Sequence, residues 1–119
     1  MRLLFVCVGN SCRSQMAEGI ARSMGYIADS AGTHPAENIA PNAIKVLNSK
    51  GISTAGMVPK SVDLFSADDY DMVISMGCGV NCPLMRIDDD WELEDPVGQE
   101  LAVYQTTAGE IERRLNLIK

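Results

Sequence analysis

Short apolar runs along the chain predict its strands. Each run is bounded by polar residues or glycine, which is typical of a strand buried on both faces of a sheet. Such runs occupy residues 2–7, 26–31 and 71–76, and we expect a short fourth strand near residues 91–93. The pattern therefore predicts a sheet of four strands.

Apolar residues spaced by three and four predict helices between and after these runs. Two helices are expected over about residues 13–24 and 41–51, and a short one over 61–65 that Ser61 caps. The last helix is expected over about residues 98–117. Its inward-facing stripe is predicted to consist of Leu101, Tyr104, Ala108, Ile111, Leu115 and Ile118.

The alternation of strands and helices indicates an α/β fold. Crossovers between successive parallel strands are right-handed and lay helices against the sheet. We therefore expect a three-layer arrangement with a four-stranded parallel sheet and helices on both faces. A chain of 119 residues suffices for one hydrophobic core but not for two, so residues 1–119 are expected to form a single domain.

Composition narrows the class of partner. The net charge of -6 and the few aromatic residues argue against a nucleic-acid-binding surface. The N-terminal apolar run stops at Val8, too early for a secretory signal, and no stretch approaches a membrane span. We expect a cytoplasmic protein without a membrane partner. There its four cysteines stay reduced and indicate catalysis, redox cycling or metal binding.

The clearest candidate chemistry follows the first predicted strand. Cys7 ends that strand, and Arg13 opens the next helix after five intervening residues. A polar loop of this size can bend its N–H groups around one tetrahedral oxyanion, while the helix N-terminus and the guanidinium add positive charge. The same field favours the nucleophilic thiolate of Cys7. The predicted anion-binding residues are Val8, Gly9, Asn10, Ser11, Cys12, Arg13 and Ser14.

Two interpretations of this stretch are open from the residues alone. One is an oxyanion pocket with a nucleophile at its floor. The other is a buried cysteine at a strand end, followed by an ordinary loop. Cys78 and Cys82 follow the third predicted strand and should reach the same sheet edge as Cys7, because parallel strands share a carboxyl edge. Glycines on either side of Cys78 lead us to expect a mobile loop there.

The chain resembles the low-molecular-weight protein tyrosine phosphatase superfamily. The resemblance lies in Cys7-Val-Gly-Asn-Ser-Cys12-Arg13-Ser14, Met16-Ala17-Glu18, Ser30-Ala31-Gly32 and Asp95-Pro96. Residues 10–18, Asn81-Cys82-Pro83 and the segment from Trp91 to Gly98 are similar to its thiol-coupled arsenate reductases. Both resemblances imply the phosphatase-type fold with an oxyanion loop.

The resemblance also implies roles for individual residues. Cys7 would attack arsenate, Arg13 would clamp the oxyanion and Asp95 would act as the general acid. Cys78 and then Cys82 would carry a disulfide away from Cys7, and thioredoxin or a similar thiol protein would reduce it. Phosphate or sulfate would fit the same loop. Without the resemblance, Asp95 before Pro96 is the aspartate of a turn.

No cofactor is expected, with one qualification from the resemblance. Four residues match positions that bind a monovalent cation in some of these reductases: Asn10, Glu18, Ser30 and Asp63. We prefer to interpret them as a hydrogen-bond network that braces the loop. For Cys12, a packing role is favoured over a backup disulfide with Cys7.

Two other functions compete with arsenate reduction. A phosphatase would use Cys7, Arg13 and Asp95 to hydrolyse phosphomonoesters, but Val97 and Gly98 stand where such enzymes usually place aromatic residues to hold a substrate ring. A zinc or arsenite sensor would use Cys78 and Cys82 with a third cysteine. That second alternative leaves the guanidinium of Arg13 without a function.

Overall fold

A computed structural model describes residues 1–77, 86–93, 96 and 98–118 of the chain. Four strands form one sheet in the order β2-β1-β3-β4, and every neighbouring pair is parallel. The strands are β1 (Arg2–Cys7), β2 (Ile27–Gly32), β3 (Met72–Ser75) and β4 (Asp89–Asp90). Because the strands are parallel, the loops after β1 and β3 leave from the same edge, as the sequence predicted.

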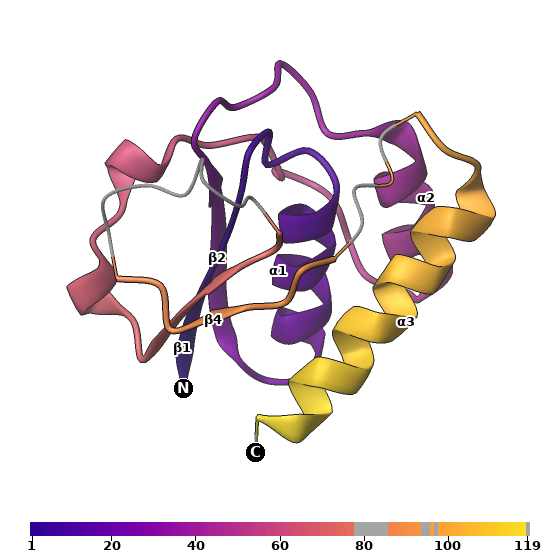
Figure 1. Cartoon of the computed structure of the whole chain (residues 1–119). Helices are drawn as coiled ribbons and strands as arrows, with labels where there is room; N and C mark the ends of the chain where they lie inside the picture. The colour runs from indigo at the N-terminus through magenta and orange to yellow at the C-terminus, as the bar shows by residue number, and fades with distance from the viewer. Residues whose placement is uncertain (78–85, 94–95, 97, 119) are drawn as a thin grey trace.

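Helices cover the two faces of the sheet unequally. Three α-helices lie on one side and two 3-10 helices on the other (Figure 1). The α-helices are α1 (Arg13–Ser23), α2 (Pro41–Ser49) and α3 (Leu101–Leu117), and the 3-10 helices are η1 (Val62–Leu64) and η2 (Ala67–Asp69). Ser61 caps η1 by accepting from the N–H of Asp63. The predicted α/β fold with a four-stranded parallel sheet is thus confirmed.

The central strand β1 explains why its sequence is a continuous apolar run. Leu3 and Phe5 point into the core shared with the three α-helices, whereas Leu4 and Val6 point into a smaller core under η1 and η2. All four side chains are fully buried. A strand buried on both faces needs apolar residues at successive positions.

The fourth strand lies two residues earlier than predicted. It is Asp89–Asp90, paired with Ile74 and Ser75, instead of residues 91–93. Trp91 turns into the core and its ring packs at 5.8 Å from that of Phe5, while Glu92 has a φ of +49° that ends the extended backbone. The prediction was wrong because an edge strand with exposed acidic side chains carries no apolar pattern.

Helix α3 begins three residues later than predicted. Gly98 has a φ of +80°, which no helical residue adopts, and the helix starts at Leu101. Leu101 was predicted to face the core. This was wrong, since its side chain is 36% exposed. The central members of the stripe are buried as predicted, namely Tyr104, Ala108, Ile111 and Leu115.

Candidate active site

The loop between β1 and α1 directs its carbonyl groups away from its own centre. Each carbonyl from Cys7 to Cys12 accepts a hydrogen bond from a group elsewhere. The N–H groups of Thr33, His34 and Ala36 donate to the carbonyls of Cys7, Val8 and Gly9. The side-chain amide of Gln15 donates to Asn10, and the N–H groups of Ala40 and Met16 donate to Ser11 and Cys12. In a trans peptide the N–H points opposite to the C=O, so the N–H groups of the loop face inward.

The sulfur of Cys7 accepts from one of these N–H groups and lies beside the hydroxyl of Ser14. The N–H of Asn10 donates to Cys7 Sγ at 3.2 Å, and Ser14 Oγ lies 2.8 Å from the same sulfur. Ser14 Oγ already accepts from Asn10 Nδ2 at 2.8 Å, which leaves its hydroxyl hydrogen for the sulfur. Two donors on one sulfur stabilise a thiolate. Such a ring of inward N–H groups at a helix N-terminus is an anion-binding arrangement.

Asn10 is the hub of this loop. Its φ of +49° lies in the left-handed region, and its side chain is fully buried. Asn10 Oδ1 accepts from Gln15 Nε2 at 3.0 Å and from the N–H of Lys60 at 2.8 Å. Gln15 Nε2 also donates to the carbonyl of Val58 at 2.8 Å. Asn10, which donates to Cys7, is therefore fixed by Gln15 of α1 and by the distant segment that holds Val58 and Lys60.

Arg13 is held at the same sheet edge by backbone oxygens. Its Nη1 donates to the carbonyl of Met76 at 2.5 Å and to that of Leu93 at 2.9 Å. The side chain is 5% exposed. These anchors follow β3 and β4, so the two neighbouring strands orient the guanidinium beside the loop. The role of Arg13 as an oxyanion clamp stays a prediction.

Two glycines allow the close contacts around the loop. A Cβ on Gly32 would lie 2.5 Å from the carbonyl oxygen of Val8 and 3.0 Å from the backbone nitrogen of Asn10. A Cβ on Gly77 would lie 2.8 Å from the carbonyl oxygen of Leu93 and 3.1 Å from Arg13 Nη1. Gly77, which we expected to give freedom to the loop that follows, thus also makes room for the anchor of Arg13.

Of the four residues matched to a monovalent cation site, Glu18 is the deepest charged one. Its carboxylate accepts from Ser30 Oγ at 2.8 Å and pairs with Lys60 Nζ and Arg22 Nη1, each at 3.4 Å. Asp63, by contrast, is exposed in η1. Because two side-chain cations already neutralise Glu18, these residues do not fit a bound monovalent cation.

Three predicted catalytic residues, Cys78, Cys82 and Asp95, lie outside the described residues. The same holds for Val97, and so for part of the expected pocket mouth. Within the described ranges no group of three His, Cys, Asp or Glu side chains is placed to hold a metal ion. In that same part of the chain, no helix has the length and apolar character to cross a membrane.

Sequence reasoning missed several residues that build the site. Gln15 and Lys60 brace Asn10, and the carbonyls of Met76 and Leu93 hold Arg13. A polar amide directly after Arg13-Ser14, in a helix that packs on the sheet, was the one available signal for Gln15. No local pattern marks a backbone N–H or carbonyl 50 to 80 residues away as a partner.

Comparison with known proteins agrees with this geometry. The family described as low molecular weight phosphotyrosine protein phosphatase matches residues 2–118. A protein of Synechocystis sp. (strain ATCC 27184 / PCC 6803 / Kazusa) named glutaredoxin arsenate reductase is 44% identical over 125 residues, which cover 98% of this chain and 95% of that protein.

Solved structures are similar over nearly the whole chain as well. One, described as an arsenate reductase in the phosphate binding state, is 42% identical with a TM-score of 0.88, and the match covers 98% of this chain and 95% of that one. A low molecular weight protein tyrosine phosphatase from T. tengcongensis is 32% identical with a TM-score of 0.80, covering 99% and 97%. The chain therefore belongs to the low molecular weight phosphotyrosine protein phosphatase family, within which it is similar to proteins named as arsenate reductases.

Proposed function

We propose that this protein reduces arsenate to arsenite with Cys7 as the nucleophile. The observation that carries the proposal is the sulfur of Cys7, which accepts from Asn10 and lies beside Ser14 Oγ, at the base of a loop whose carbonyls bond outward. Inward N–H groups and Arg13 suit a tetrahedral oxyanion. The relatives named as arsenate reductases favour arsenate as that oxyanion.

In the first step the thiolate of Cys7 attacks arsenic(V). An As–S bond forms and one As–O bond breaks, and the departing oxygen takes up a proton and leaves as water. Asp95 supplies this proton in the proposed mechanism, since hydroxide is a poor leaving group without one. The donors at the loop stabilise the negative charge on the remaining arsenate oxygens.

In the second step a second thiol attacks the sulfur of Cys7. An S–S bond forms, the As–S electron pair stays on arsenic, and arsenic(III) leaves as arsenite. Cys78 is the proposed attacking residue. Cys82 then attacks Cys78 and releases Cys7 as a thiol, so the disulfide ends between Cys78 and Cys82. Thiolate exchange of this kind conserves the two electrons throughout.

A thiol protein must reduce that disulfide for a second turnover. We propose thioredoxin or a similar protein of a reducing compartment such as the cytoplasm. The Synechocystis relative is named for glutaredoxin, so glutaredoxin with glutathione is the donor to compare. Arsenite production with each donor, measured at equal reductant supply, distinguishes the two.

A single-turnover experiment tests the proposed reaction. Reduced protein is mixed with arsenate and no reductant, and arsenite and free thiols are counted over time. We expect one arsenite for each pair of thiols lost, competition by phosphate, and neither product nor thiol loss with Cys7→Ser. Arsenite formed without thiol loss, or thiol loss without arsenite, would contradict the proposal.

Phosphatase activity is the second candidate, because the family and the oxyanion loop are shared with phosphatases. Hydrolysis of an aryl phosphate would need Cys7 and Arg13 but not the second thiol. The variant Cys78→Ser separates the functions, since it should stop arsenite release and leave any phosphate hydrolysis intact. Fast hydrolysis with no thiol loss on arsenate would favour the phosphatase.

A further inference from the structure

A buried carboxylate lies one helical turn beyond the oxyanion loop. Glu18 in α1 is 2% exposed, and burial of a carboxylate is costly unless a cation or several donors compensate it. Two cations contact it. Arg22 is 53% exposed and also pairs with Asp29 at 3.1 Å, whereas Lys60 is 23% exposed. Lys60 is therefore the better shielded of the two.

Lys60 is attached to the oxyanion loop as well as to Glu18. Its backbone N–H donates to Asn10 Oδ1 at 2.8 Å, and its carbonyl accepts from the N–H of Gly32 at 2.7 Å. Its ammonium reaches Glu18 Oε1 at 3.4 Å and the carbonyl of Val58 at 3.3 Å. Main chain and side chain of one residue thus join the buried carboxylate to the hub of the loop.

A displacement of Lys60 would reach the sulfur through Asn10. Asn10 holds a φ of +49°, in the left-handed region that L-residues other than asparagine and aspartate rarely adopt. Its N–H donates to Cys7 Sγ and its Nδ2 to Ser14 Oγ, which itself lies against that sulfur. A chain of hydrogen bonds therefore links the backbone of Lys60 to both groups that contact the Cys7 sulfur.

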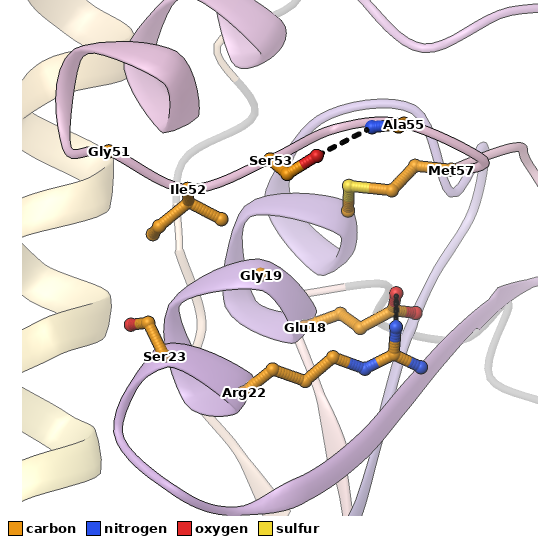
Figure 2. A pocket seen from close by; sticks show the side chains of 9 residues that line it. All are labelled: Glu18, Gly19, Arg22, Ser23, Gly51, Ile52, Ser53, Ala55 and Met57. Carbon is orange, nitrogen blue, oxygen red and sulfur yellow. Dashed lines mark hydrogen bonds and ion pairs between the residues drawn. The ribbon is translucent and has the colours of Figure 1, made fainter.

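An open cavity borders Glu18. It has a volume of about 320 Å³ and is lined by Glu18, Arg22, Ile52, Ser53, Met57 and neighbouring small residues. Figure 2 shows the carboxylate of Glu18 at its wall, with Arg22 alongside and the side chain of Met57 above. A small cation from solvent therefore has a route to Glu18 if the ammonium is removed.

We propose that Lys60 is a positioning residue of the oxyanion loop, and that its ammonium is the shielded cation that, with Arg22, neutralises Glu18 and makes a bound monovalent cation unnecessary. The proposal rests on Cys7 being the nucleophile. It concerns how the loop is held, whichever oxyanion is the substrate.

The test uses alkylation of Cys7 by iodoacetamide, followed by mass spectrometry of the Cys7 peptide, and needs no arsenate. We expect Lys60→Met to slow alkylation about tenfold, the effect of losing one charge-assisted hydrogen bond. Potassium or methylammonium ions should restore the rate, compared at equal ionic strength with a bulky tetraalkylammonium salt. Wild-type protein should respond to none of these ions.

Two control variants separate positioning from folding. Lys60→Arg keeps the charge and should alkylate at nearly the wild-type rate. The double variant Glu18→Gln, Lys60→Met removes both charges, so any remaining slow rate should be insensitive to cations. Circular dichroism confirms that each variant is folded.

Three results would overturn the proposal. They are an unchanged rate in Lys60→Met, a slow rate that no small cation restores in folded protein, and wild-type protein that itself needs potassium. Each result would leave the single-turnover test of arsenate reduction unaffected, so the failure of one proposal does not imply the failure of the other.

Discussion

Two polar networks in this protein differ in almost every respect. Around Asn10 the amide side chains of Asn10 and Gln15 are buried and uncharged, and some of their partners are distant in sequence, such as the carbonyl of Val58, 43 residues from Gln15. On α3 the groups are charged, partly exposed and close in sequence. Glu110 there accepts from both Arg113 and Arg114.

The difference shows which polar contacts a fold depends on. An ion pair between neighbours on an exposed helix face is screened by water and contributes little. A buried amide whose partners are removed loses hydrogen bonds that water cannot replace, which costs far more. The centre of the candidate loop, at Asn10 and Gln15, is built from contacts of the second kind. Its shape should therefore be sensitive to single substitutions.

Substitution of Gly32 should have the largest effect on the buried network. In Gly32→Ala the new Cβ meets the Val8 carbonyl at 2.5 Å, a contact with backbone that no side-chain rotation relieves. We expect a loss of about 3 kcal/mol in the free energy of unfolding. Cys7 alkylation should slow as well. Denaturant unfolding and mass spectrometry measure the two effects.

Gly109→Ala is the matched control. Gly109 lies within α3, and a Cβ there would meet nothing within 4 Å. The same substitution should raise stability by about 0.5–1 kcal/mol, because alanine favours the helix. If both variants changed stability equally, the close approach at Gly32 would not be what holds the loop.

Substitution of Gln15 comes second. Gln15→Leu keeps the volume but removes the buried donor to both oxygens of Asn10, and with it the part-buried bond to the Val58 carbonyl. We expect a loss of about 2 kcal/mol, measured by denaturant unfolding. Gln105→Leu on the exposed face of α3 should change stability by less than about 0.5 kcal/mol. Equal losses in the two variants would contradict the comparison.

The sequence was sufficient for the parts of the fold that local patterns determine. The continuous run of β1 and the proline at the start of α2 place these elements within a residue or two. The edge strand β4 was misplaced because acidic residues at a sheet edge have no apolar period. Its pairing with β3 depends on backbone hydrogen bonds, which residue types do not record.

The candidate site divides in the same way. Cys7 and Arg13 were predicted from their spacing, because a strand, a short polar loop and a helix follow one another in the chain. The outward carbonyls and the anchors of Arg13 were not, since their partners come from the 33–40 segment and from Met76 and Leu93. Local sequence patterns therefore predict the reactive groups, whereas the orientation of those groups depends on contacts made in the tertiary fold.

Substitution of Asp88 should have the third largest effect on stability, between that of the buried network and that of the exposed ion pairs on α3. The pKa of this carboxyl lies below its ordinary value of 3.8. The largest cause is the hydrogen bond from the N–H of Val73, and the hydrogen bond from Arg86 adds to it. Since the folded-state pKa is lowered, the carboxylate stabilises the protein above pH 3.8. This contribution is lost as pH falls further, towards the folded-state value.

For Asp88→Ala we expect a loss of about 1 kcal/mol at neutral pH that shrinks in acid. Unfolding measured across this pH range checks it. Asp88→Asn retains an acceptor for Val73 and should recover part of the loss. A loss independent of pH would mean that the charge of Asp88 does not matter.

Glu110 should show the smallest effect. The hydrogen bonds from Arg113 and Arg114 lower the pKa of Glu110 to about 2, but the side chain is partly exposed, so water and salt screen its ion pairs. With a lowered folded-state pKa, the carboxylate stabilises the protein above its ordinary pKa of 4.5, and this contribution disappears between 4.5 and about 2. Glu110→Gln should therefore destabilise less than Asp88→Ala at neutral pH.

High salt should abolish the difference in stability between Glu110→Gln and wild type, whereas the loss in Gln15→Leu should persist, because no charge is involved there. If salt left the Glu110 effect unchanged, the α3 network would be more than a screened surface contact.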